Sequence, residues 1–168
     1  MSSKVTKREE PIVEVYEAIY GREEKVVIRK AVPDDYFSLA ELAAQLGHQE
    51  EPGKLRSRLL SLLGRPDQVI FVAEFEQEIV GWVHGYLYKF LYLDLACELA
   101  ALVVDQAHRQ LGIGRMLVDA IEKWASAQGC HQVSLRSNIK REEAHKFYKA
   151  IGYDLRKTQH IFEKDLNK

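Results

Sequence analysis

The sequence predicts an α/β fold in which helices flank one mixed, mostly antiparallel sheet. Short apolar or alternating runs, typical of strands, take turns with longer stretches whose apolar residues recur at helical spacing. In chain order they predict strand, helix, helix, three strands, helix, strand, helix and strand. Hydrophobic residues make up 46% and charged residues 29% of the 168 residues, as in an ordinary soluble globular protein with a substantial core.

The first 25 residues are predicted to be an N-terminal extension, followed by a single domain over residues 26–168. Inside the extension, residues 11–21 fit one short helix, but VEVY within them also alternates like a strand, so both interpretations stay open. The regular pattern begins with a β-rich run over residues 25–35 (KVVIRKAVPDD).

Two helices and a hairpin are predicted next. Pro33, followed by two aspartates, is typical of a first helical turn, and this helix runs to Gly47. A weaker helix covers residues 54–64. Two strand-like runs, residues 68–76 and 78–90, flank a polar turn and predict a β-hairpin.

The second half of the chain is predicted to alternate between strands and helices. An aromatic-rich loop around residues 88–96 leads into a nearly continuous apolar strand at residues 95–105, which is expected to be buried on both faces. A helix follows HRQLGIGR and ends at Gly129. The remaining expected elements are a strand at 130–137, a helix at 141–152 and a last strand at 157–166.

The stretch HRQLGIGR, residues 108–115, places two glycines at a helix entrance, where each costs roughly 1 kcal/mol relative to alanine. Helical N–H groups without partners and the helix dipole favour an anion at such a place. Arg109 and Arg115 add positive charge. The lysine of a P-loop and the wider dinucleotide spacing are both missing. From this motif alone, a phosphate site and an ordinary tight turn both remain open.

Three more residues are candidates for chemistry. Glu98 interrupts the apolar run LACELAALVV, and a buried carboxylate is costly unless it is paired, solvated or protonated. It is either a general base or a group near water at a strand end. Tyr148 lies beside Phe147 on an apolar helix face, which favours packing, although its hydroxyl needs a partner. Asn138 is a residue type preferred at helix N-caps.

Other features narrow the function. Tyr86, Tyr88, Phe90 and Tyr92 recur at period two, which indicates one strand face, either packed in the core or lining an acceptor pocket. The histidines share no metal-ligand spacing. Cys97 and Cys130 form no metal or redox motif, so no metal site is predicted.

Charge and hydropathy argue against several partners. The net charge of -1 gives no support for nucleic-acid binding, and no apolar run approaches the ~20 residues that span a bilayer. The first residues lack the apolar core of a secretory signal. A cytoplasmic protein with no membrane partner is therefore expected.

Together, these features resemble the GCN5-related N-acetyltransferase (GNAT) superfamily over about residues 26–165. RQLGIG, residues 109–114, is similar to the family's acetyl-CoA motif, Arg/Gln-x-x-Gly-x-Gly/Ala after a strand. SNIKREEAHKFYKAIGYD is similar to the later signature, in which an asparagine precedes an alanine, an aromatic-tyrosine pair and Gly-Phe/Tyr. The resemblance implies the GNAT-like acyl-CoA N-acyltransferase fold, with acetyl-CoA as co-substrate.

The resemblance also implies roles for individual residues. Glu98 matches a strand glutamate that many members use as general base, directly or through water, and Tyr148 matches the tyrosine that protonates the departing thiolate. Backbone groups of Leu102 and Val104 should pair with the pantetheine arm and polarise the acetyl carbonyl. Those of Gln110 to Arg115 should hold the pyrophosphate. The implied cofactor-binding residues are Leu102, Val104, Arg109, Gln110, Leu111, Gly112, Ile113, Gly114, Arg115 and Asn138.

The expected reaction is direct transfer of an acetyl group from acetyl-CoA to a primary amine of a small molecule, because the pattern is most similar to small-molecule members, including aminoglycoside-type acetyltransferases. A protein or peptide acceptor, a longer acyl donor and a CoA-binding module without turnover are the alternatives. Residues 33–64 and 88–96 should shape the acceptor site. Members commonly dimerise, so a homodimer is a further expectation, although no stretch specifies an interface.

Overall fold

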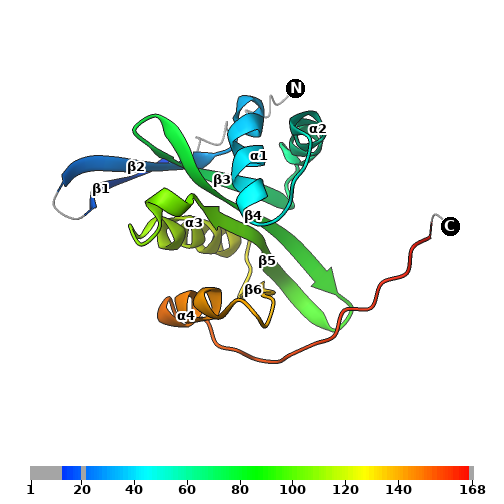
Figure 1. Ribbon diagram of the computed structural model, residues 1–168. Coiled ribbons are helices and arrows are strands. Elements are labelled where there is room, and N and C mark those ends of the chain that lie inside the picture. The colour runs from blue at the N-terminus through cyan, green and yellow to red at the C-terminus, as the bar shows by residue number, and fades with distance from the viewer. Residues whose placement is uncertain (1–12, 20–21, 167–168) are drawn as a thin grey trace, which may run out of the picture. The chain divides into compact units, whose positions relative to one another are not determined.

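The computed structural model describes residues 13–19 and 22–166, which divide into two compact units, one up to Arg136 and one from Ser137 onward (Figure 1). The described strands are β1 (Val13–Ile19), β2 (Arg22–Lys30), β3 (Gln68–Phe75), β4 (Glu78–Phe90), β5 (Leu93–Val104) and β6 (Val133–Leu135). The helices are α1 (Tyr36–Gln45), α2 (Pro52–Leu62), α3 (Ile113–Ala127) and α4 (Glu142–Ala150), with short 3-10 turns at Pro33–Asp35 and Gln106–His108.

The strands of the first unit form one sheet in the order β1-β2-β3-β4-β5-β6. Neighbours from β1 to β5 pair antiparallel, and β6 pairs parallel to β5 through three residues, Cys97 to Leu99 facing Val133 to Leu135. The predicted mixed, mostly antiparallel sheet is therefore confirmed, including the hairpin between β3 and β4.

The N-terminal segment contributes a strand. Val13 to Ile19 pair with β2, so the strand interpretation holds for this stretch and the helix interpretation is wrong. Residues 11–12 and 20–21, at the ends of the stretch first considered, lie outside the described residues. The division into an extension and a single domain at residue 25 remains a prediction.

Helices cover both faces of the sheet in the first unit: α3 lies on one face, and α1 and α2 lie on the other (Figure 1). A Cβ on Gly85 would lie only 2.7 Å from Cδ1 of Ile121, so the missing side chain lets α3 approach β4 closely. On the opposite face, Leu39 and Leu59 of the two helices pack with Ile70 and Val72 of β3. The sheet is thus a central layer between two apolar cores.

An ion pair fixes the entrance of α1 to the sheet. The guanidinium of Arg29 on β2 donates to both oxygens of Asp35 at 2.8 and 3.0 Å and to Glu74 at 3.0 Å. Asp35 also accepts a hydrogen bond from the N–H of Val32 at 2.8 Å. This buried carboxylate is fully engaged, and the helix predicted from Pro33 begins here as a 3-10 turn before α1.

Two further sequence expectations are wrong. The predicted loop at residues 88–96 is the end of a long β-hairpin, because β4 continues to Phe90 and β5 begins at Leu93 after a two-residue turn. The predicted last strand at residues 157–166 is absent: residues 154–165 form no regular element and their side chains are exposed. A strand exists only through hydrogen bonds to a neighbour, which residue composition alone cannot supply.

Candidate active site

The turn between β5 and α3 has the backbone that the sequence motif requires. Gly112 is the N-cap residue of α3 with φ +81°, a left-handed conformation that favours glycine. Gln110 is also left-handed, at φ +65°, which for a non-glycine residue costs free energy. The first N–H groups of the 15-residue α3 have no partner within the helix and lie at its positive end. This turn is chemically suited to an anion.

Side chains on both sides of the turn hold it in place. Asp105 accepts from the N–H of Ala107 at 3.0 Å and lies 2.8 Å from Nδ1 of His108. Gln45, at the end of α1, donates to Asp105 at 2.8 Å and accepts from the N–H of Gln106 at 3.1 Å. The Gln45 contact, followed by the His108 contact, lowers the pKa of Asp105, so the carboxylate stays ionised.

Sequence reasoning did not identify this network. The Asp-x-x-His spacing from Asp105 to His108 was a usable local signal, because a carboxylate before a helical turn commonly caps it. Gln45 gave no signal, since it lies 60 residues before its partner.

The two arginines of the motif differ in their environments. Nε of Arg109 donates to the carbonyl oxygen of Val104 at 3.2 Å, which ties the turn to the end of β5. Arg115 is exposed and lies 3.9 Å from Asp119, one helical turn further on. Arg109 is therefore anchored, whereas Arg115 adds charge on the surface of α3.

A β-bulge in β5 reverses the direction in which the backbone N–H groups of this strand point. Cys97 donates its N–H toward β6, to the oxygen of Gln132 at 3.1 Å, whereas Asp105 donates toward β4, to Val80 at 2.8 Å. In a regular strand these two N–H groups would point the same way, because they are an even number of residues apart. The reversal occurs at Ala100, where the register shifts: Leu99 pairs with Gly85, but Ala101 pairs with His84.

The bulge gives the predicted donor residues an open edge. Beyond Ala100, the backbone groups of Leu102 and Val104 point away from β4, and β6 pairs with β5 only as far as Leu99. Within the described part of the first unit, no strand covers this edge. These outward backbone groups lead directly to the turn at Gly112, and the carbonyl oxygen of Val104 already accepts from Nε of Arg109.

Glu98 lies just before the bulge and is 8% exposed. It pairs in register with Tyr86 of β4, and its Oε2 lies 3.4 Å from Nη2 of Arg136. Burial raises the pKa of Tyr86, and the negative charge of Glu98 adds to this effect. Glu98 is therefore a buried, paired carboxylate in the middle of β5 and does not lie at a strand end, whereas its role as general base stays a prediction.

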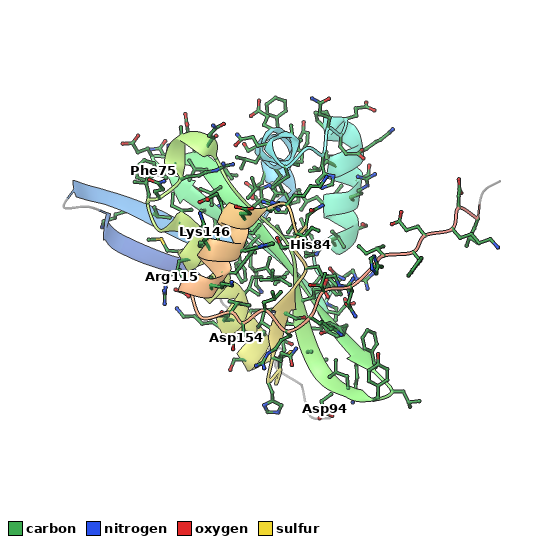
Figure 2. The ribbon with its side chains drawn as sticks, turned by 60° about the horizontal axis from the view of Figure 1, so that its bottom comes forward. Phe75, His84, Asp94, Arg115, Lys146 and Asp154 are labelled. Atoms are coloured by element: carbon green, nitrogen blue, oxygen red, sulfur yellow. The ribbon has the colours of Figure 1, made fainter. Side chains whose placement is uncertain are left out.

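The aromatic run follows the strand face that carries Glu98. Neighbouring rings from Tyr86 to Tyr92 lie 5.2 to 6.2 Å apart, and Tyr88 forms a 3.1 Å hydrogen bond with Ser134 of β6. Phe90 is 46% and Tyr92 86% exposed, so core packing accounts only for the inner end of the run. Figure 2 shows His84 between Phe75 and Asp94, which lie toward opposite ends of this sheet.

The second unit carries the other two predicted residues. Asn138 is not the N-cap of α4: its Oδ1 accepts from the N–H of Lys140 at 2.9 Å in a turn, and the N-cap is Arg141. Tyr148 packs edge-on against Phe147 and Tyr153, with ring centres 5.1 and 5.8 Å away. Burial raises the pKa of Tyr148. The phenol therefore keeps its proton at neutral pH.

Comparison with known families decides the identity. Residues 34–153, which include β5, the turn at Gly112 and α4, match the model of the acetyltransferase (GNAT) family. The chain belongs to the GNAT family. It is accordingly an acetyl-CoA-dependent N-acetyltransferase.

Individual relatives agree with this assignment. An uncharacterised N-acetyltransferase of Bacillus subtilis, YhdJ, is 42% identical over 50 residues, which span 30% of this GNAT chain and 35% of that relative. The aminoglycoside N-acetyltransferase AAC(6')-Iy, solved with CoA, superposes with a TM-score of 0.78 at 17% identity and covers 86% of this chain and 97% of its own.

A second aminoglycoside enzyme, AAC(6')-IG of Acinetobacter haemolyticus, gives a TM-score of 0.74 at 17% identity over 83% of this chain and 99% of its own. At these identities the two structures establish the GNAT fold.

The first unit of this GNAT chain thus brings together most of the predicted site residues, from Glu98 through Val104 to Arg115. Asn138 and Tyr148 belong to the second unit. Among the described residues, no cluster of three or more His, Cys, Asp or Glu side chains is arranged to hold a metal ion. None of the described helices is both long and apolar enough to cross a membrane.

Proposed function

We propose that this GNAT protein transfers the acetyl group of acetyl-CoA directly to a primary amine of a small molecule. The observation that carries the proposal is the continuous path along β5: a buried carboxylate at Glu98, an open backbone edge at Leu102 and Val104, and the helix start at Gly112. These groups suit an amine, an amide-bearing arm and a pyrophosphate in that order. The fit supports acetyl-CoA as co-substrate.

The residues divide the binding work as follows. N–H groups from Gln110 to Arg115 hold the pyrophosphate at the positive end of α3, with charge added by Arg109. The outward backbone groups of Leu102 and Val104 pair with the pantetheine arm and orient the thioester carbonyl toward fixed donors. Asn138 is assigned to the cofactor arm on the basis of family resemblance. Bound acetyl-CoA supplies the activated acetyl group.

Two side chains move protons. An alkyl ammonium group has a pKa near 10 and becomes a nucleophile only after it loses a proton, which Glu98 accepts directly or through water. As the new C–N bond forms and the C–S bond breaks, Tyr148, assigned to this step by family resemblance, gives its proton to the sulfur. The proton that leaves the attacking nitrogen then returns to the phenolate through solvent. No covalent enzyme intermediate is required. Burial raises the pKa of the Cys97 thiol to about 12, which makes it a poor nucleophile.

A small amine, and first an aminoglycoside, is the acceptor to test. The support is the fold shared with AAC(6')-Iy and AAC(6')-IG, whose names state that they act on aminoglycosides. The purified chain should release free CoA from acetyl-CoA in the presence of an aminoglycoside, a polyamine or another amine of a panel. A panel that includes peptides separates the peptide acetyltransferase alternative. CoA binding without release of CoA with any acceptor would instead support a binding module.

Glu98 can be tested within the same assay. Glu98→Gln should remove the acid limb of the pH dependence of kcat/KM, because the amide cannot accept the proton of the amine. A pH profile identical to that of the unmodified enzyme would assign the base role to another group or to bulk water.

A further inference from the structure

On the sheet face opposite α3, the buried carboxylate of Glu98 lies beside tyrosine side chains. Glu98 of β5 faces the same side as its register partner Tyr86 on β4. Tyr88 follows on the same face of β4 and is held by its hydrogen bond to Ser134 on β6. Three strands therefore build a surface in which Glu98 is the negative charge and the tyrosine rings are its neighbours.

Among the described residues, Arg136, just after β6, is the cation that contacts Glu98, and the contact differs from that of a tightly bound ion pair. Nη2 of Arg136 lies 3.4 Å from Oε2 of Glu98, while the Arg136 side chain is 70% exposed. The ion pair between Arg29 and Asp35 is different: Arg29 donates to both oxygens of Asp35 at 2.8 and 3.0 Å, and its side chain is only 24% exposed. Arg136 thus makes one long contact with Glu98, and most of its side chain lies in solvent.

Such a contact is easily exchanged. An ion pair made by an exposed side chain contributes little free energy, because water competes for both charges. Glu98 itself is buried, and a buried carboxylate without a cation is costly. The carboxylate therefore needs a positive group, whereas Arg136 loses little by returning to water. An incoming cation can replace it without leaving Glu98 unpaired.

We propose that Arg136 is a positioning residue that fills the ammonium subsite of the acceptor, against Glu98, until a primary ammonium group displaces it. This inference rests on the proposed function and adds a specificity element to that site. A guanidinium and an alkyl ammonium donate to the same carboxylate oxygens, and aromatic faces such as those of Tyr86 and Tyr88 also attract cations. Cationic amines, rather than neutral nucleophiles, are the class that this exchange selects.

The exchange predicts an effect opposite to that of an ordinary binding residue. Arg136→Gln removes a competitor, so KM for the amine should fall about two- to fivefold, the factor that an exposed ion pair contributes. KM for acetyl-CoA should stay unchanged. Arg136→Lys retains a cation and should return KM for the amine toward the unmodified value. A purely structural role of Arg136 would instead lower the melting temperature without lowering KM for the amine.

A binding experiment separates this inference from the proposed function. The full chain labelled with ¹³C at the glutamate carboxyls is titrated with ethylammonium chloride in the absence of acetyl-CoA, and the Glu98 signal is assigned with Glu98→Gln. The Glu98 signal should respond, and half-saturation should occur at a two- to fivefold lower concentration in Arg136→Gln. Arg65→Gln is the matched control, because Arg65 forms an exposed ion pair with Asp67 in a loop before β3.

The outcomes are distinct. Failure to acetylate any amine, with the expected NMR response intact, would reject the proposed function but keep the ammonium subsite. No response of Glu98, or equal or weaker ammonium binding in Arg136→Gln than in the Arg65→Gln control, would overturn the role of Arg136. A raised KM for acetyl-CoA in Arg136→Gln would also overturn it, because Arg136 would then serve the donor.

Discussion

At the scale of single residues, Tyr148 tests whether the second unit contributes chemistry or only packing. Its ring packs between Phe147 and Tyr153, and these contacts persist in Tyr148→Phe. The loss of the hydroxyl should lower kcat on the order of 100-fold, as for a missing general acid, and leave the Kd for acetyl-CoA nearly unchanged. Steady-state kinetics and calorimetry check this. An unaltered kcat would assign Tyr148 to packing, and Tyr153→Phe provides the matched control.

The ionisation of Asp105 should make the stability of this turn depend on pH. Its pKa is lowered by Gln45 first and by His108 next, so the folded state holds the ionised form more tightly than the unfolded chain does. The resulting stabilisation is present above the unfolded pKa of about 3.9 and is lost as the pH falls through the lower folded pKa. The difference in free energy of unfolding between the unmodified chain and Asp105→Asn should therefore shrink from pH 6 to pH 3.

Urea unfolding at both pH values measures this difference. A difference that is independent of pH would contradict the role assigned to the ionised carboxylate. Gln45→Ala should reduce the pH-dependent part of the difference, because Gln45 is the largest cause of the lowered pKa of Asp105.

At the scale of elements, the glycines at the two ends of α3 allow a matched pair of alanine substitutions. Gly112 and Gly129 have φ values of +81° and +84°, so alanine at either position should lower the free energy of unfolding by about 1 kcal/mol. Only Gly112→Ala places a methyl group at the proposed pyrophosphate site, so only this variant should weaken acetyl-CoA binding. Denaturant unfolding and calorimetry test both statements. Equal affinities in the two variants would remove the turn from the donor site.

The entrance of α1 depends on a buried ion pair. Arg29→Met would leave Asp35, which is 6% exposed, without its main partner and should lower the free energy of unfolding by about 3 kcal/mol. The exposed pair between Arg65 and Asp67 is the control, and Arg65→Met should change stability by less than about 0.5 kcal/mol. Equal effects of the two substitutions in urea unfolding would contradict the anchoring role of Arg29.

At the scale of the whole molecule, donor binding should stabilise the folded chain. A ligand that binds only the native state adds about 2.7 kcal/mol at 100 times its Kd, so acetyl-CoA should raise Tm with increasing concentration. Thermal unfolding with acetyl-CoA, and with an equal concentration of ATP as control, measures the effect. No shift of Tm at millimolar acetyl-CoA would contradict the proposed donor site.

Much of the fold and part of the site could be predicted from local patterns. The hairpin of β3 and β4, the helix after Gly112 and α4 all follow from periodicity and turn residues within short windows. The motif RQLGIG indicated the turn correctly because its requirement, a left-handed glycine before a helix, is local. The last strand was predicted wrongly, because strand formation depends on a partner elsewhere in the chain.

What the sequence by itself determined is the family, the order of most elements and the candidate residues from Glu98 to Tyr148. Only the tertiary structure decided that Ala100 is a bulge, that Leu102 and Val104 face an open edge, and that Arg136 and Gln45 reach Glu98 and Asp105. The physical reason is range. Turns and helical faces depend on neighbours a few residues away, whereas strand register and ion pairs join residues that only the folded chain brings together.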